Sequence, residues 1–273
     1  MFQTISDFLS FDFILRALLV GTLVSLCAAL LGVTLVLKRY SMIGDGLSHV
    51  GFGALSVALA MNIAPLHVAV PVVIISAFFL LKLSENSKIK GDAAIALISS
   101  SSVAIGVIVT SIKKGMNMDV MSYMFGSTLA ISDEDALISI ILSIVVVTIY
   151  ILFYNKIFAV TFDESFASAS GTNVKAFNML IALLTAITIV IGMRIMGTML
   201  ISSLIIFPAL SSMRVFKNFH SVVISSAVIS IVCFIIGIFA SFIYEIPAGA
   251  SVVVSNLVVF LAMNMTGFLI KKK

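Results

Sequence analysis

The chain has 273 residues, of which 61% are hydrophobic and 10% are charged, and its net charge is +4. A soluble globular domain carries about 25% charged residues, so this composition excludes that class and indicates an integral membrane protein in a lipid bilayer. Apolar runs of roughly 17–25 residues predict membrane-spanning helices, because barrel strands would alternate over about 10 residues. The small positive charge does not point to nucleic acid as a partner.

Apolar runs recur along the whole chain and predict an all-α, polytopic fold with about 8–9 transmembrane helices in a single domain, residues 1–273. The N-terminus does not resemble a cleavable signal, because Asp7 and Asp12 precede a long first run. The nine runs cover residues 13–37, 47–63, 66–83, 93–112, 135–154, 176–193, 197–213, 220–243 and 248–270.

The distribution of Lys and Arg predicts the orientation. If the runs alternate across the membrane, twelve of these residues fall on one side and four on the other, which accounts for all 16. The side richer in Lys and Arg is normally cytoplasmic, so we expect the N-terminus outside and the C-terminus inside. The twelve are Lys38, Arg39, Lys82, Lys88, Lys90, Lys156, Lys175, Arg214, Lys217 and Lys271 to Lys273.

A polar motif lies at the start of the second apolar run, at Gly44-Asp45-Gly46-Leu47-Ser48-His49. On a helix, Asp45 and His49 would share one face, with their Cβ atoms about 5–6 Å apart. Ionisable side chains are costly in a membrane span and usually have a function there. A carboxylate and an imidazole suit Zn, Mn or Fe, and a homodimer would raise two ligands to four. The alternative is that Asp45 caps the helix and His49 bonds a neighbouring backbone carbonyl.

Glycines surround this motif on both sides. We expect Gly44 and Gly46 to permit a bend before the helix begins. Gly51 and Gly53 are expected to allow another helix to approach closely.

The stretch 113–134 does not fit a plain spanning helix. Its methionines suggest either copper capture at the outer face or one apolar face of a short helix. Ser132 and Asp135, with acidic residues in the first turn, predict the start of the next helix, and the alternative for these acidic residues is attraction of cations at the outer face. The methionines are Met116, Met118, Met121 and Met124.

The stretch 162–171 predicts a short amphipathic helix on the cytoplasmic side. Phe162 and Phe166 are spaced i, i+4, Asp163 and Glu164 lie at its start, and Gly171 ends it. Such a helix could bind a soluble partner or lie on the bilayer.

Other chemistry has little support in the sequence. There is no Walker A, HExxH or GxSxG motif, so we expect no ATP hydrolysis and no enzyme activity by this chain alone. Cys27 and Cys233 fall inside apolar runs without CxxC spacing, so they are expected to be buried small hydrophobes. No permanently bound cofactor is expected.

Four motifs in order resemble the permease subunit of ATP-binding-cassette (ABC) importers for zinc, manganese and iron. The segment 44–49 is similar to the family's Gly-Asp-small-x-Ser/Ala-His element. Phe162-Asp163-Glu164 with Ala167 and Gly171 resembles its coupling helix. The segments 192–209 and 246–250 resemble its Pro-Ala segment and its Ile-Pro-Ser/Thr-Gly start.

The resemblance implies a transport system in the cytoplasmic membrane. Two permease copies would form the pathway, two cytoplasmic ATPase subunits would drive it, and an extracytoplasmic protein would deliver the metal. Asp45 and His49 would contact the transported ion, and Phe162, Asp163, Glu164, Phe166, Ala167 and Gly171 would couple the chain to the ATPase.

Three alternatives remain from the residues alone: a secondary transporter coupled to protons through Asp45 and His49, a membrane scaffold, and an ABC permease for metal-chelate or vitamin cargo. Nine runs without visible halves argue against a secondary transporter, which tends to show an internal repeat.

Overall fold

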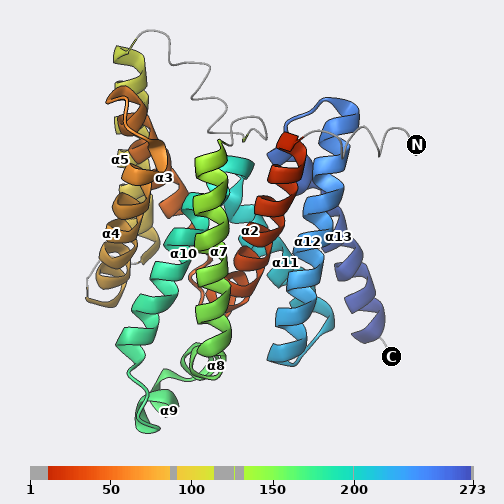
Figure 1. The fold of residues 1–273 in the computed structure, drawn as a ribbon. Coiled ribbons are helices and arrows are strands. Elements are labelled where there is room, and N and C mark those ends of the chain that lie inside the picture. The colour runs from red at the N-terminus through yellow and green to blue at the C-terminus, as the bar shows by residue number, and fades with distance from the viewer. Residues whose placement is uncertain (1–11, 87–90, 114–125, 127–131, 199, 272–273) are drawn as a thin grey trace.

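The computed structural model describes residues 12–86, 91–113, 126, 132–198 and 200–271, and these residues form helices connected by short turns (Figure 1). The all-α prediction is therefore confirmed. The helices are α2 (Asp12–Leu37), α3 (Ser41–Ala60), α4 (Pro65–Asn86), α5 (Gly91–Ile112), α7 (Asp133–Leu152), α8 (Tyr154–Phe162), α9 (Glu164–Ala169), α10 (Val174–Met196), α11 (Ile201–Val215), α12 (Phe219–Tyr244) and α13 (Ala248–Lys271).

Eight helices of the described residues are long and apolar enough to cross a membrane. The exception among the nine predicted runs is α11, which has 15 residues. It is about 22 Å long and so falls short of the roughly 30 Å hydrocarbon core. The prediction of about 8–9 spans agrees with this count, since α11 crosses only part of the layer.

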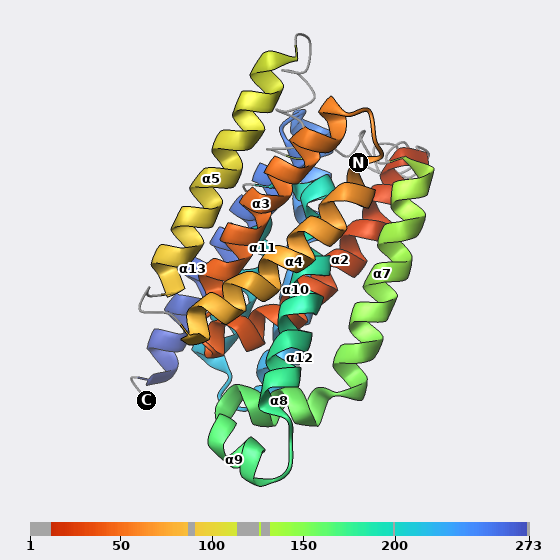
Figure 2. The ribbon, with the colours of Figure 1, turned by 90° about the vertical axis from the view of Figure 1, so that its left-hand side faces the viewer.

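The long helices run up and down through one layer, with α8 and α9 together at one end (Figures 1 and 2). The start of α2 lies at the opposite end from α8 and α9, whereas α13 ends on their side (Figure 1). Among the described residues, Lys38, Arg39, Lys156, Lys175 and Lys217 therefore lie at or next to the end that carries α8 and α9. These members of the larger basic group share one end of the protein, and the orientation in the membrane stays a prediction.

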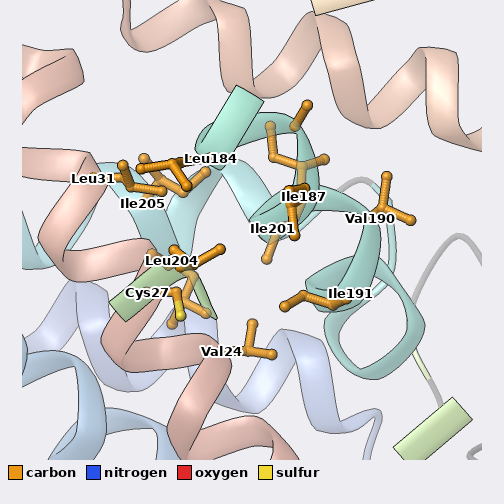
Figure 3. Close-up of a cluster of buried hydrophobic side chains, with 14 of the residues drawn as sticks. Val24, Cys27, Leu31, Leu184, Ile187, Val190, Ile191, Ile201, Leu204 and Ile205 are labelled. Carbon is orange, nitrogen blue, oxygen red and sulfur yellow. The ribbon is translucent and has the colours of Figure 1, made fainter. Parts of the chain in front are cut away.

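The core lies where α2, α10 and α11 meet (Figure 3). The spans of α2, α3 and α10 are each 72% buried within the chain, against 11% for α5 and 17% for α13. Central and peripheral helices are thus distinguished by packing rather than by hydropathy. Side chains of this core include Val24, Cys27, Leu31, Leu184, Ile187, Val190, Ile191, Ile201, Leu204 and Ile205.

Two predicted boundaries can be compared directly. The start of α7 is confirmed, because the Ser132 hydroxyl accepts a hydrogen bond from the Asp135 backbone N–H at 3.1 Å. The predicted start of the second helix is wrong, because α3 begins at Ser41, six residues before the predicted residue 47. The apolar run underestimates the length of this helix because hydropathy does not register its polar first turns.

The methionines of 113–134 lie outside the described residues.

Candidate functional site

The motif of residues 44–49 lies inside α3 rather than before it. The N-cap is Tyr40, which makes no side-chain cap, so the proposed capping role of Asp45 is wrong. Asp45 begins the second turn and His49 follows one turn later, so both side chains lie on the same face.

Asp45 and His49 contact each other on that face. His49 Nε2 lies 3.6 Å from Asp45 Oδ2, which is an ion-pair distance rather than a hydrogen bond. The two side chains are 21% and 38% exposed, so both remain reachable from outside the chain. Ser202 of α11 donates its hydroxyl to Asp45 Oδ1 at 3.4 Å, and this holds the carboxylate from a second helix.

His49 borders an open cavity of about 550 Å³ between α3 and α5. Its polar lining comes from His49, Ser99 and Ser100, and the remainder is apolar, from Val103, Ala104, Val107 and Ile108. A side chain that can bind a metal therefore faces a space large enough for a hydrated ion.

Close packing fixes α3 in this position. A Cβ at Gly46 would lie 2.6 Å from Ile95, one at Gly53 would lie 2.7 Å from the backbone oxygen of Ser102, and one at Gly51 would lie 2.5 Å from Met193 Sδ. The prediction of close approach at Gly51 and Gly53 is confirmed. The predicted bend at Gly44 and Gly46 is wrong, because the helix is continuous there and both residues are buried in it.

Within the part of the chain that the structure describes, Asp45 and His49 do not belong to a larger ligand set. Among the described residues there is no group of three or more His, Cys, Asp or Glu side chains that could hold a metal ion. Cys27 and Cys233 are buried and free, as the sequence predicts.

The stretch 162–171 is not one helix: it contains the last residue of α8, the Asp163 cap, the short helix α9 and the turn that follows it. Phe162 ends α8, and Asp163 caps α9 by accepting a hydrogen bond from the Phe166 backbone N–H at 2.9 Å. The prediction that Phe162 and Phe166 share one helical face is therefore wrong. The Asp163 side chain interrupts the helix by binding the backbone locally. Gly171 does end the segment, with φ +81°.

The six candidate coupling residues differ in what they offer a partner. Phe166 is 67% exposed, whereas Ala167 is fully buried. Phe162 packs its ring against Phe158 and Phe219, at centroid distances of 4.9 and 5.8 Å. Phe162 is 58% exposed, so Phe166 is the more exposed of the two phenylalanines and makes no such ring contact among those described.

Glu164, whose side chain is half exposed, pairs with a residue that sequence reasoning did not single out. Lys38 Nζ lies 2.6 Å from Glu164 Oε1, and the Lys38 side chain is only 5% exposed. Asn178 of α10 also donates to Glu164 Oε1, at 3.2 Å. Partial burial alone would raise the pKa of Glu164, but the hydrogen bonds from Lys38 and Asn178 and the Lys38 charge lower it below its ordinary value.

The model of the ABC 3 transport family matches residues 10–267 of this chain. The chain belongs to this family. It is 30% identical to the high-affinity zinc uptake system membrane protein ZnuB of Haemophilus influenzae over 250 residues, which is 92% of this chain and 96% of that protein. It is 27% identical to the manganese import system permease protein ScaB of Streptococcus gordonii over 251 residues, 92% of this chain and 90% of that protein.

The fold agrees with this assignment to the ABC 3 transport family. The solved structure of PsaBC from Streptococcus pneumoniae in complex with Fab matches with a TM-score of 0.86 at 26% identity, covering 96% of this chain and 94% of that chain. The chain is accordingly a multi-pass membrane protein of a transport system and not itself a catalyst. An ABC family also favours ATP-driven transport over the secondary transporter and the scaffold.

Proposed function

We propose that this chain is the permease subunit of an ABC importer that moves Zn²⁺, Mn²⁺ or Fe²⁺ inward across the cytoplasmic membrane. The family and the zinc and manganese systems of its relatives support the transport class. The observation that carries the assignment of a metal to this chain is the contact between Asp45 and His49 on one face of α3.

The geometry of the pair suits one shared ion. In tetrahedral coordination, two ligand atoms that each lie about 2.1 Å from zinc are about 3.4 Å apart. The observed Nε2–Oδ2 distance is 3.6 Å, so a small adjustment would bring both atoms to one ion.

Two ligands per chain make a transit site rather than a storage site. An ion that is carried across must bind weakly enough to leave again. A second copy placed against the open α3–α5 side would bring a second pair to the cavity and raise the ligands to four. We therefore propose a homodimer with the pathway between the copies.

The ATPase subunits are proposed to bind at the end that carries α8 and α9. The larger group of basic residues in the sequence supports a cytoplasmic location for this end and for the C-terminus, with the N-terminus outside. An extracytoplasmic metal-binding protein would then deliver the ion at the opposite end.

Replacing the pair tests the proposal. In the complex reconstituted with its ATPase and binding protein, Asp45→Ala and His49→Ala should each reduce metal uptake at least about 100-fold, since even groups that only support a metal ligand contribute about 10–100-fold. Uptake of radioactive zinc and manganese, each with the other as competitor, measures the effect and identifies the preferred ion.

The matched control is His67→Ala, which removes an exposed histidine from the other end of the membrane layer and should leave uptake unchanged. All three variants should assemble with the ATPase as the wild type does. Wild-type uptake by Asp45→Ala and His49→Ala would rule out the site.

A further inference from the structure

Lys38 is a buried cation that joins three elements. It follows the last residue of α2, and its Nζ donates to the Val160 backbone oxygen of α8 at 3.1 Å and to Glu164 of α9 at 2.6 Å. A charge this well buried requires a partner, and removing the partner alone is strongly unfavourable. The ion pair therefore fastens α9 to the end of α2, across 126 positions of sequence.

A short, hydrogen-bonded turn connects Lys38 to the metal-binding pair. Arg39 has φ +61°, and the Tyr40 backbone N–H donates to the Leu35 oxygen at 2.8 Å, so the chain turns at once into α3. Asp45 lies seven positions after Lys38, at the start of the second turn of α3. A displacement of Lys38 would therefore be passed to Asp45 through a tight turn and one helical turn.

Glu164, at the α9 end of the connection, is also held by hydrogen bonds. Glu164 is the first residue of α9, directly after the Asp163 cap, and Asn178 holds its carboxylate from α10. Because Glu164 belongs to α9, it moves with this helix. The hydrogen bonds from Lys38 and Asn178 must then either follow the movement or break.

We propose that Lys38 is the positioning residue that transmits movement of α9 to the Asp45–His49 pair, through its ion pair with Glu164 and the α2–α3 turn. This inference rests on the proposed function, in which the ATPase moves α9. Lys38 does not touch the ion; it couples the ATPase-facing helix to the helix that does.

The test is Lys38→Met in the reconstituted complex, which removes the charge, keeps a long side chain, and leaves the half-exposed Glu164 carboxylate with its hydrogen bond from Asn178. The ATPase rate and co-purification should stay within about twofold of wild type, while metal transported per ATP falls about tenfold, a size typical of coupling between two sites. The matched control is Asp133→Asn, because Asp133 pairs with Arg16 at the same 2.6 Å but at the opposite end of α2. It should leave the metal-to-ATP ratio unchanged.

A second variant covers the case in which Lys38→Met does not assemble. Lys38→Met together with Glu164→Met removes both charges and leaves no unpaired ion, so the fold should tolerate it. Assembly with a low metal-to-ATP ratio supports the proposal. A wild-type ratio in either variant, or a parallel loss of ATPase activity and uptake in both, overturns it.

Metal transport by the wild-type complex distinguishes failure of the proposed function from failure of the proposed role of Lys38. If it transports no metal at all, the proposed function and the role of Lys38 both fail. If it transports metal and the variants keep its ratio, only the role of Lys38 fails.

Discussion

The absence of a Cβ atom at Gly46 and Gly53 allows α3, which carries Asp45 and His49, to pack closely against α5. The hydrogen of Gly53 leaves room for the Ser102 backbone of α5, and Gly46 leaves room for Ile95 of the same helix. Asp45 and His49 lie on the helix that these contacts hold against α5. The separation of the two helices, and with it the width of the cavity beside His49, therefore depends on these small residues.

Gly53→Ala should destabilise the protein by about 1–3 kcal/mol, as overpacking usually does, because its Cβ would lie 2.7 Å from a backbone oxygen that cannot rotate away. Thermal unfolding in detergent measures the effect. Gly44→Ala is the matched control on the same helix, since its Cβ would meet only the end of the Ile205 side chain at 3.4 Å. Equal stability of the two variants would contradict this account.

At the scale of elements, α8 and α9 form one unit with two separate tasks. Phe158, Phe162 and Phe219 pack as a three-ring cluster, which fastens α8 to α12. Glu164 fastens α9 to Lys38. Phe166 takes no part in these attachments and stays exposed, so it is free to bind a partner.

Phe166→Ala should weaken binding of the purified ATPase by about 2 kcal/mol or more, roughly 30-fold, as expected for an aromatic hot spot. The stability of the permease should not change, because the ring is exposed. Binding to the permease in nanodiscs gives the affinity.

Phe79→Ala serves as the control, because this phenylalanine is 55% exposed and lies on α4 rather than on α8 or α9. Equal affinities for the two variants would show that α9 is not the binding surface.

At the scale of the whole molecule, the chain carries half of the site that we propose. One of the two ligands, His49, borders an open cavity, and α5, which forms its other wall, is only 11% buried within the chain. A second copy against this side would complete the ligand set and cover part of α5.

Cysteine cross-linking tests this arrangement. Ala104→Cys, in the cavity wall, should form a disulfide-linked dimer in membranes after oxidation, whereas Leu137→Cys on the exposed side of α7 should not. The native Cys27 and Cys233 are buried, so they leave the background low. Gel electrophoresis without reducing agent reads out the result, and a monomeric Ala104→Cys would place the dimer interface elsewhere.

The sequence by itself determined the membrane class, the order of the helices and the candidate ligands. Long apolar runs leave a chain no alternative in lipid but helices, because each backbone group must find its partner locally. The i, i+4 spacing of Asp45 and His49 likewise places them on one face wherever the helix begins.

Only the tertiary structure decided the contacts that span the sequence. The sequence indicates only that Lys38 is a basic residue in a loop, whereas in the folded protein its Nζ lies 2.6 Å from Glu164 Oε1. Ser202 reaches Asp45 across 157 positions, and the Asp163 cap divides a segment that spacing alone predicts to be one helix. Periodicity reports which face of a helix is apolar, whereas the partner of a polar side chain depends on which helices pack together.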